Sequence, residues 1–179
     1  MLRLSLQSER AVTTFERFIN RNTQWYLDAV ADGSILVPHA FMTFFLPEAA
    51  ASEMLNYLTN NSDASLGATD IPVFPMFTPN FKRVLQKMPA GDLAFQIRVY
   101  REAVQEGSAE HLRMIKINTE NFVPKILAMR GKVYPPHSPL LTKSQWLQHY
   151  GQETMSFFAE AKKRYDPDAV LNPGASIFT

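Results

Sequence analysis

The stretch LAFQIRVY, residues 93–100, decides the fold because it is the clearest strand pattern in the chain. Apolar and polar side chains alternate along it, as in a strand whose two faces have different surroundings. The preceding stretch IPVFPMF, residues 71–77, is apolar but contains Pro72 and Pro75. Because proline cannot donate to a sheet ladder, this segment is predicted to be an edge strand or an extended segment.

Two further strands are predicted on either side of this region. The stretch ILVPHAFMTFFL, residues 35–46, is strongly apolar and aromatic, which is typical of a buried strand. Pro38 near its start indicates that regular pairing begins after His39. Residues 132–134, with the sequence KVY, are predicted to form a short strand.

Helical patterns lie between these strands. Pro47 fits the first turn of a helix. Its predicted inner stripe is Ala51, Leu55 and Leu58. Ser108 is positioned to cap another helix, whose apolar stripe advances in steps of three and four residues. That stripe is Leu112, Ile115, Thr119, Phe122, Ile126 and Met129. The regular steps predict one continuous helix that is kinked at Pro124 and ended by Gly131.

The order strand, helix, strand, strand, helix, strand over residues 35–134 is that of a split β-α-β unit. We therefore predict an α+β fold: a ferredoxin-like antiparallel sheet with helices on one face, plus a C-terminal helical segment. Several phenylalanines fall on three of the predicted strands. Those on the sheet face without helices would need a second cover, such as a ligand, a flavin ring or another polypeptide.

Helical patterns also flank this core. Ser8 can cap a helix with an apolar stripe that continues to Val30, and Gly33 suits the left-handed position after its end. Residues 142–145, with the sequence TKSQ, form a capping box. The helix that it opens is predicted to bury Leu147, Tyr150, Phe157, Ala161 and Tyr165. Between the core and this helix, the proline-rich run 135–139 marks a boundary.

Composition excludes several classes of function. The chain has 179 residues, no cysteine and a net charge of +1. The small charge gives no indication of nucleic acid or an anionic membrane as a partner. Without cysteine there is no disulfide, thiolate nucleophile or cysteine zinc site. No apolar stretch is long enough to span a membrane, and the N-terminus is unlike a signal peptide, so we expect a cytoplasmic protein. Glycine-rich phosphate-binding motifs are also absent.

Titratable side chains show no catalytic or metal-binding pattern. No two histidines have metal-ligand spacing on one predicted helix, so we assign no metal ligand. His39 and His137 each follow a proline beside an aromatic strand, where a structural hydrogen bond is favoured over catalysis. The acidic pair Asp166 and Asp168 flanks a turn and is expected to be solvated. No residue of this chain is assigned as catalytic.

The C-terminal stretch KKRYDPDAVLNPGASIF, residues 162–178, resembles the terminal signature of flavoproteins of the vanillyl-alcohol-oxidase type. The matching residues are Tyr165, Asp166, Pro167, Leu171, Pro173, Gly174 and Phe178. Two more stretches are similar to cytokinin dehydrogenases: residues 15–47, a helix leading into a Pro-His strand, and residues 132–151, KVYPPHSPLLTKSQWLQHYG. The resemblance extends from about residue 9 to residue 178.

This resemblance implies a division of the chain. Residues 1–138 would belong to a substrate (cap) domain with its ferredoxin-like core at 35–134, and residues 139–179 would belong to the flavin-binding domain. FAD would be bound mainly by an N-terminal domain or subunit that this chain lacks. The chain would shape the substrate side of the flavin and act on a small organic substrate only with that partner. The alternative is a free-standing, non-catalytic binding module of ferredoxin-like type.

The resemblance also implies site residues. Those expected to contact the flavin are Tyr134, Pro173 and Gly174. Those expected on the substrate side are Phe41, Thr43, Phe74 and Pro135. Phe41 stands where cytokinin dehydrogenases have Trp, and Thr43 where they have Asn, so hydrogen-bond recognition of an adenine-like ligand would be weaker. We therefore expect a flavin oxidoreductase relative with a substrate other than cytokinin. Apolar surface left without its partner domain would also favour self-association.

Overall fold

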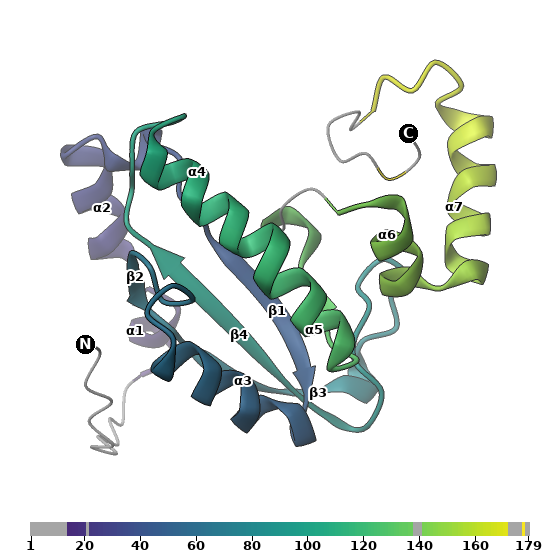
Figure 1. Cartoon of the computed structure of the whole chain (residues 1–179), viewed down its shortest axis with the longest axis horizontal. Coiled ribbons are helices and arrows are strands. Elements are labelled where there is room, and N and C mark those ends of the chain that lie inside the picture. The colour runs from purple at the N-terminus through teal and green to yellow at the C-terminus, as the bar shows by residue number, and fades with distance from the viewer. Residues whose placement is uncertain (1–13, 21, 138–140, 172–176, 178–179) are drawn as a thin grey trace.

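The computed structural model describes residues 14–20, 22–137, 141–171 and 177 (Figure 1). Its centre is an antiparallel sheet of five strands. The strands are β1 (Met42–Pro47), β2 (Ala68–Asp70), β3 (Val73–Phe77), β4 (Leu93–Arg101) and β5 (Lys132–Val133). β4 pairs with β1 on one side and with both β2 and β3 on the other, and β5 pairs with the outer side of β1. This is the predicted ferredoxin-like order.

The sheet is covered on one face by α3 (Glu48–Asn60) and by the helical run α4 (Ala109–Lys116), η3 (Ile117–Phe122) and α5 (Val123–Ala128) (Figure 1). The core lies between these helices and the sheet. Its buried side chains include Phe44, Met54, Leu58, Ile97, Val99, Phe122 and Ile126. The α+β prediction, with helices on one sheet face, is therefore confirmed. The 3-10 turns are η1 (Ser34–Leu36), η2 (Thr78–Asn80) and η4 (Pro135–His137).

For the predicted helix that Ser108 caps, the predicted buried face is wrong over the first half. The run is not an α-helix kinked at Pro124, because η3 between α4 and α5 is π-helical. A π turn contains an extra residue, so it rotates the buried face relative to an α-helical pattern. Leu112 is consequently 58% exposed, whereas Met114 and Asn118 are buried. From Phe122 onward the predicted stripe agrees with the buried face.

Gly131 has a different role from the predicted one. The left-handed residue at the end of α5 is Arg130, with φ of 58°. Gly131 is instead required for close packing, because a Cβ there would lie 2.6 Å from the Leu46 side chain and 2.8 Å from the Phe45 carbonyl oxygen. The glycine therefore allows the chain to approach β1 at the start of β5.

The N-terminal helical region consists of two helices rather than one, α1 (Phe15–Ile19) and α2 (Thr23–Ala31). Thr14 caps α1 by accepting a hydrogen bond from the Arg17 amide, and the predicted start at Ser8 lies outside the described residues. Gly33 adopts the expected left-handed conformation. These two helices carry many exposed large apolar side chains: Phe15, Phe18, Ile19, Trp25, Tyr26, Leu27 and Val30.

The C-terminal helix is also divided in two, α6 (Lys143–Tyr150) and α7 (Gln152–Tyr165). The capping box between Thr142 and Gln145 is present as predicted. Gly151, with φ of 83°, separates the helices, so one continuous stripe cannot form. The predicted burial is therefore wrong for Leu147, Phe157 and Tyr165, which are exposed, and right for Tyr150. α6 instead packs its Trp146 and Tyr150 into the same cluster as the sheet. Within the described residues, no helix is long and apolar enough to cross a membrane.

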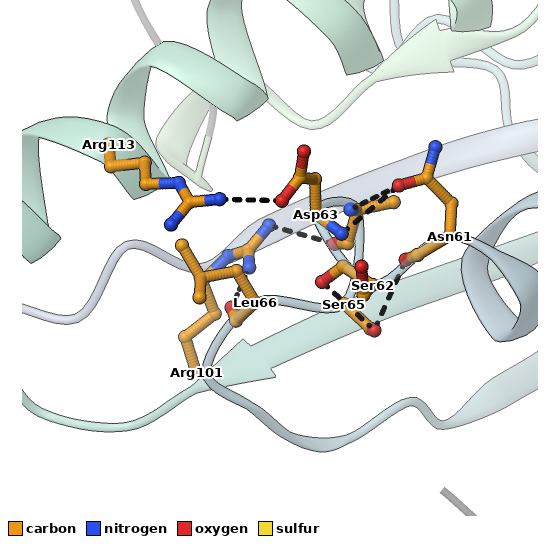
Figure 2. A network of polar contacts seen from close by, with 8 residues as sticks. Asn61, Ser62, Asp63, Ser65, Leu66, Arg101 and Arg113 are labelled. Carbon is orange, nitrogen blue, oxygen red and sulfur yellow. Dashed lines mark hydrogen bonds and ion pairs between the residues drawn. The ribbon is translucent and has the colours of Figure 1, made fainter. Parts of the chain in front are cut away.

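A buried guanidinium connects the end of β4 to the loop after α3 (Figure 2). Arg101 is 2% exposed and donates to the carbonyl oxygens of Leu66 and Ala64. It also donates to Asn118 Oδ1 at 3.1 Å, which joins η3 to the same point. Burial lowers the pKa of Arg101 to about 10, so the side chain remains charged at neutral pH.

Candidate functional site

α3, α4 and α5 cover one face of the sheet (Figure 1), and the strand register assigns a second set of side chains to the other face. Alternation along β1 and β4 sends Phe44 and Ile97 toward the helices and their neighbours to the other face. The register pairs Thr43 with Arg98, and Gln96 with both Phe45 and Phe74. We call this surface the open face and define it by Thr43, Phe45, Phe74, Gln96, Arg98 and Tyr100.

Aromatic rings surround the open face at the end nearest β5. The ring centroid of Phe41 lies 5.0 Å from that of Tyr100 and 6.2 Å from that of His137. Tyr134 follows β5 and lies 5.1 Å from the His137 ring in an edge-to-face arrangement. Edge-to-face ring pairs of this kind add stability beyond that gained by burying the rings. His137 thus joins Phe41 and Tyr134 into one aromatic wall.

His137 has a structural hydrogen bond, as the sequence indicated. Its Nδ1 lies 3.0 Å from Thr43 Oγ1, within hydrogen-bonding distance. Burial, and then the nearby charge of Arg98, lower the pKa of His137 below its ordinary value. The imidazole is therefore neutral at neutral pH. It fixes Thr43 and the aromatic wall without adding charge.

The structure brings most of the predicted site residues together. Phe41, Thr43, Phe74 and Tyr134 lie on the open face or at its margin, from segments far apart in the chain, and Pro135 directly follows Tyr134. Thr43 is 2% exposed and therefore supports the face from beneath, while the others are half-buried. Pro173 and Gly174 lie outside the described residues.

Sequence reasoning missed the polar centre of the open face. Arg98 donates through Nε to Gln96 Oε1 at 3.0 Å and through Nη1 to the Tyr100 hydroxyl at 2.9 Å. Its guanidinium carbon lies 5.1 Å from the Phe74 ring centroid, close enough for a cation–π contact. In the sequence, Gln96, Arg98 and Tyr100 occupy alternate positions of LAFQIRVY. This alternation assigns them to one face of a strand but does not indicate a binding site.

A pocket of about 540 Å³ adjoins the open face, between α2 and the end of the sheet where β2 pairs with β4. Its lining includes Trp25, His39, Phe41, Asp70, Tyr100 and Glu102. Both ring nitrogens of His39 lie near backbone carbonyl oxygens, at 3.2 Å from that of Arg101 and 3.3 Å from that of Ser34. His39 is therefore structural here, as expected. Among the described residues, no cluster of histidine and acidic side chains has the makings of a metal site.

Asp166 organises the return loop after α7. Its Oδ1 accepts a hydrogen bond from the Val170 amide at 2.9 Å, and its Oδ2 accepts one from the Leu171 amide at 3.0 Å. Lys162 also contacts this carboxylate, and that contact is the main cause of the lowered pKa of Asp166. The expectation of a solvated side chain is wrong, because Asp166 is 6% exposed. The Asp of the Tyr-Asp-Pro signature thus shapes the loop that leads into its Pro-Gly.

Replacing Asp166 with alanine is expected to speed amide hydrogen exchange at Val170 and Leu171, because both amides lose their acceptor. Hydrogen-exchange NMR measures this directly. The exposed neighbour Asp168 supplies the matched control, and Asp168→Ala should leave both rates unchanged. Equal exchange in the two variants would show that the carboxylate does not hold the loop.

The fold and this face together define a ferredoxin-like α+β domain with an aromatic wall on the sheet face opposite α3, α4 and α5. The family profile described as "Cytokinin dehydrogenase 1, FAD and cytokinin binding" matches residues 5–178. The chain therefore belongs to this family of FAD- and cytokinin-binding domains. The predicted resemblance to cytokinin dehydrogenases is confirmed.

Individual relatives agree with this assignment. The chain is 26% identical over 152 residues to cytokinin dehydrogenase 1 of Arabidopsis thaliana, covering 83% of this chain and 26% of that protein. It is 28% identical over 148 residues to cytokinin dehydrogenase 6 of Oryza sativa subsp. japonica, covering 80% and 27%. It is also 26% identical over 158 residues to a Rhodococcoides fascians protein named "Uncharacterized oxidoreductase ORF5 in fasciation locus", covering 88% and 35%. The chain thus spans about a quarter to a third of the length of these relatives.

Proposed function

We propose that this chain supplies the substrate side of a FAD-dependent oxidoreductase and oxidises a small organic substrate only together with an N-terminal flavin-binding domain or subunit. The observation that carries the proposal is the placement of Phe41, Phe74 and Tyr134 on or beside the open face. Their half-buried rings offer an apolar wall to a planar ligand. Such a wall is what a substrate held against a flavin ring requires.

The described residues fit one part of FAD and not the rest. Tyr134 would contact the flavin ring, and Pro173 and Gly174 would follow in the return segment. The described glycines with positive φ, such as Gly33 and Gly67, stand singly between elements of the chain. None of them belongs to a glycine-rich strand-to-helix loop of the kind that holds a pyrophosphate. FAD, when bound, supplies the redox chemistry, and this chain orients the substrate and excludes water. The pyrophosphate would be held by the partner domain.

The exposed apolar side chains of α1 and α2 give that partner domain a contact surface. Trp25 and Tyr26 are more than half exposed and lie among other uncovered apolar residues of the same helices. Contiguous apolar surface of this kind usually marks an interaction site. In the absence of the partner domain, we expect it to favour self-association.

The alternative function is a free-standing, non-catalytic binding module that uses the same pocket. The pocket beside Phe41 and Tyr100 favours this alternative, because it is formed by this chain alone. A module of this kind would bind its ligand without a flavin domain and would not combine with one.

Absorption spectroscopy separates the two functions. The purified chain is expected to be colourless and to retain no FAD through gel filtration, since it lacks a pyrophosphate loop. Co-produced with the N-terminal flavin-binding domain or subunit proposed above, it should elute as a yellow complex whose flavin bands bleach when substrate is added. Near-equimolar flavin on the chain alone would contradict the proposal. Failure of the two parts to associate would favour the free-standing module.

A further inference from the structure

The most distinctive group on the open face is a cation fixed among aromatic rings. Arg98 is half-buried at the centre of β4, between Thr43 of β1 and the β3 edge. Gln96 and Tyr100 hold its Nε and Nη1 through the bonds described above, and Phe74 lies beneath the guanidinium plane. The side chain is therefore ordered before any ligand arrives, so binding costs little additional side-chain entropy.

The charge of Arg98 has no counter-charge among the described residues. None of the ion pairs found there includes Arg98. Asp70 and Glu102 line the pocket beyond Tyr100 but form no ion pair with it. Lys132 shares the face by register, but its Nζ bonds to the Gln148 and His149 carbonyl oxygens at the end of α6. The open face thus presents a net positive charge at Arg98.

The unused donors of Arg98 define the chemistry that it recognises. A guanidinium carries five N–H groups, and neutral acceptors occupy two of them here. The remaining N–H groups form a planar fork, which matches the two oxygens of a carboxylate. A phosphate dianion would be recognised with more than one cation, whereas this arginine contacts the Phe74 ring, the Gln96 amide and the Tyr100 hydroxyl. A monoanion on an apolar, planar body fits these surroundings.

We propose that Arg98 is a specificity-determining residue that binds the carboxylate of a small aromatic acid on the open face. This inference rests on the proposed function, because it names the class of substrate that the same face would take. Charge-assisted bonds to a pre-ordered guanidinium are stronger than neutral ones. A neutral analogue would leave the charge of Arg98 without compensation and would bind more weakly.

Three probes with one ring test this inference on the intact chain: benzoate, benzamide and benzylamine. Binding is followed by NMR through the Arg98 Nε–H signal and the Phe41 and Tyr100 ring signals. We expect the dissociation constant of benzoate to be at least about tenfold lower than that of benzamide, and no binding of benzylamine. Arg98→Met should remove the preference for benzoate.

Two further variants complete the test. Arg113→Met removes an exposed, ion-paired arginine elsewhere on the surface and should leave the preference unchanged. Arg98→Lys keeps the charge without the fork and should keep only part of the preference, so it replaces Arg98→Met if that variant does not fold. Equal binding of benzoate and benzamide, a preference that persists in Arg98→Met, or no binding of any probe would each overturn the inference.

The outcome is independent of the flavin domain, because every measurement uses this chain alone. If the chain fails to combine with a flavin-binding part but still selects benzoate, the proposed function fails and the carboxylate site remains. If the two parts form a yellow complex but benzoate has no advantage, the carboxylate site fails and the proposed function remains.

Discussion

Replacing Arg101 with alanine is expected to lower the free energy of unfolding by about 3–5 kcal/mol. The side chain is the largest of those that are fully buried, so its removal leaves a cavity. The Leu66 and Ala64 carbonyl oxygens and Asn118 Oδ1 would also lose their charged donor inside the protein. Removing the charge relieves its burial, but the cavity and three lost hydrogen bonds outweigh that relief. Denaturant unfolding measures the change.

Arg113 supplies the control for this prediction, because it lies in the same region of the structure (Figure 2). Its Nη2 lies 2.6 Å from Asp63 Oδ1, but the two side chains are 57% and 62% exposed. Exposed ion pairs contribute about 0–1 kcal/mol, so Arg113→Ala should change stability by no more than that. Similar losses in both variants would show that burial of Arg101 has no special importance.

The second large effect is a loss of stability in acid that depends on His149. This side chain is fully buried, and neither ring nitrogen has a hydrogen-bond partner among the described residues. Its ring lies 4.5 Å from Tyr150 and 5.9 Å from Trp146, between centroids. Burial, followed by the charges of Lys132 and Lys87, lowers the pKa of His149 from 6.5 to about 3. The folded protein therefore holds a neutral imidazole.

The sign of the pH effect follows from these two pKa values. Below pH 6.5 the unfolded chain binds a proton at His149 that the folded chain does not bind until about pH 3. Stability is therefore complete above the unfolded pKa and falls as the pH decreases toward the folded pKa. Between pH 6.5 and pH 5 the expected loss is about 1.6 kcal/mol.

Unfolding measured at both pH values tests this expectation. His149→Phe removes the titrating group from an apolar site and should abolish most of the loss, while His137, whose pKa is also lowered, accounts for a smaller remainder. His111→Gln, on α4, should retain the full loss. If His149→Phe is as acid-sensitive as the unaltered protein, another group is responsible.

Local signals in the sequence were sufficient for four of the five strands and for the starts of α4 and α6, but not for β2 or for the starts of α2 and α7. The prolines of residues 71–77 placed that segment at the sheet edge, and alternation in residues 93–100 placed β4 beside it. Ser108 and Thr142 began helices because their side chains accept hydrogen bonds from amides of the first turn. Each of these signals acts over a few residues, so no tertiary information was needed.

Burial within the helices was predicted less well, because it depends on tertiary contacts. Leu112 continues an α-helical stripe, yet the π turn of η3 places Asn118 inward instead. Asn118 is favoured there because it accepts from Arg101 and donates to the Ala40 carbonyl oxygen, both on other elements. In the same way, one pattern through residues 143–165 gave no indication that Gly151 would divide the helix.

The candidate site, like the helices, was predicted only in part from the sequence. Phe41 and Tyr134 were identified by resemblance and proved to lie in one aromatic wall. Arg98 was not identified, since a polar residue on an alternating strand is equally compatible with solvent and with a binding face. Only the bonds to Gln96 and Tyr100 show that its side chain is held in place.

The contact between Asn118 and Ala40 makes the position of the aromatic wall depend on the opposite side of the sheet. Asn118 Nδ2 donates to the Ala40 carbonyl oxygen at 3.0 Å while its Oδ1 accepts from Arg101. Ala40 immediately precedes Phe41, so a helix side chain anchors the peptide that carries the first ring of the wall. A change in the helical layer would therefore reach the ligand-facing side through one backbone hydrogen bond. The shape of the surface offered to a ligand is set in part by a residue that the ligand never contacts.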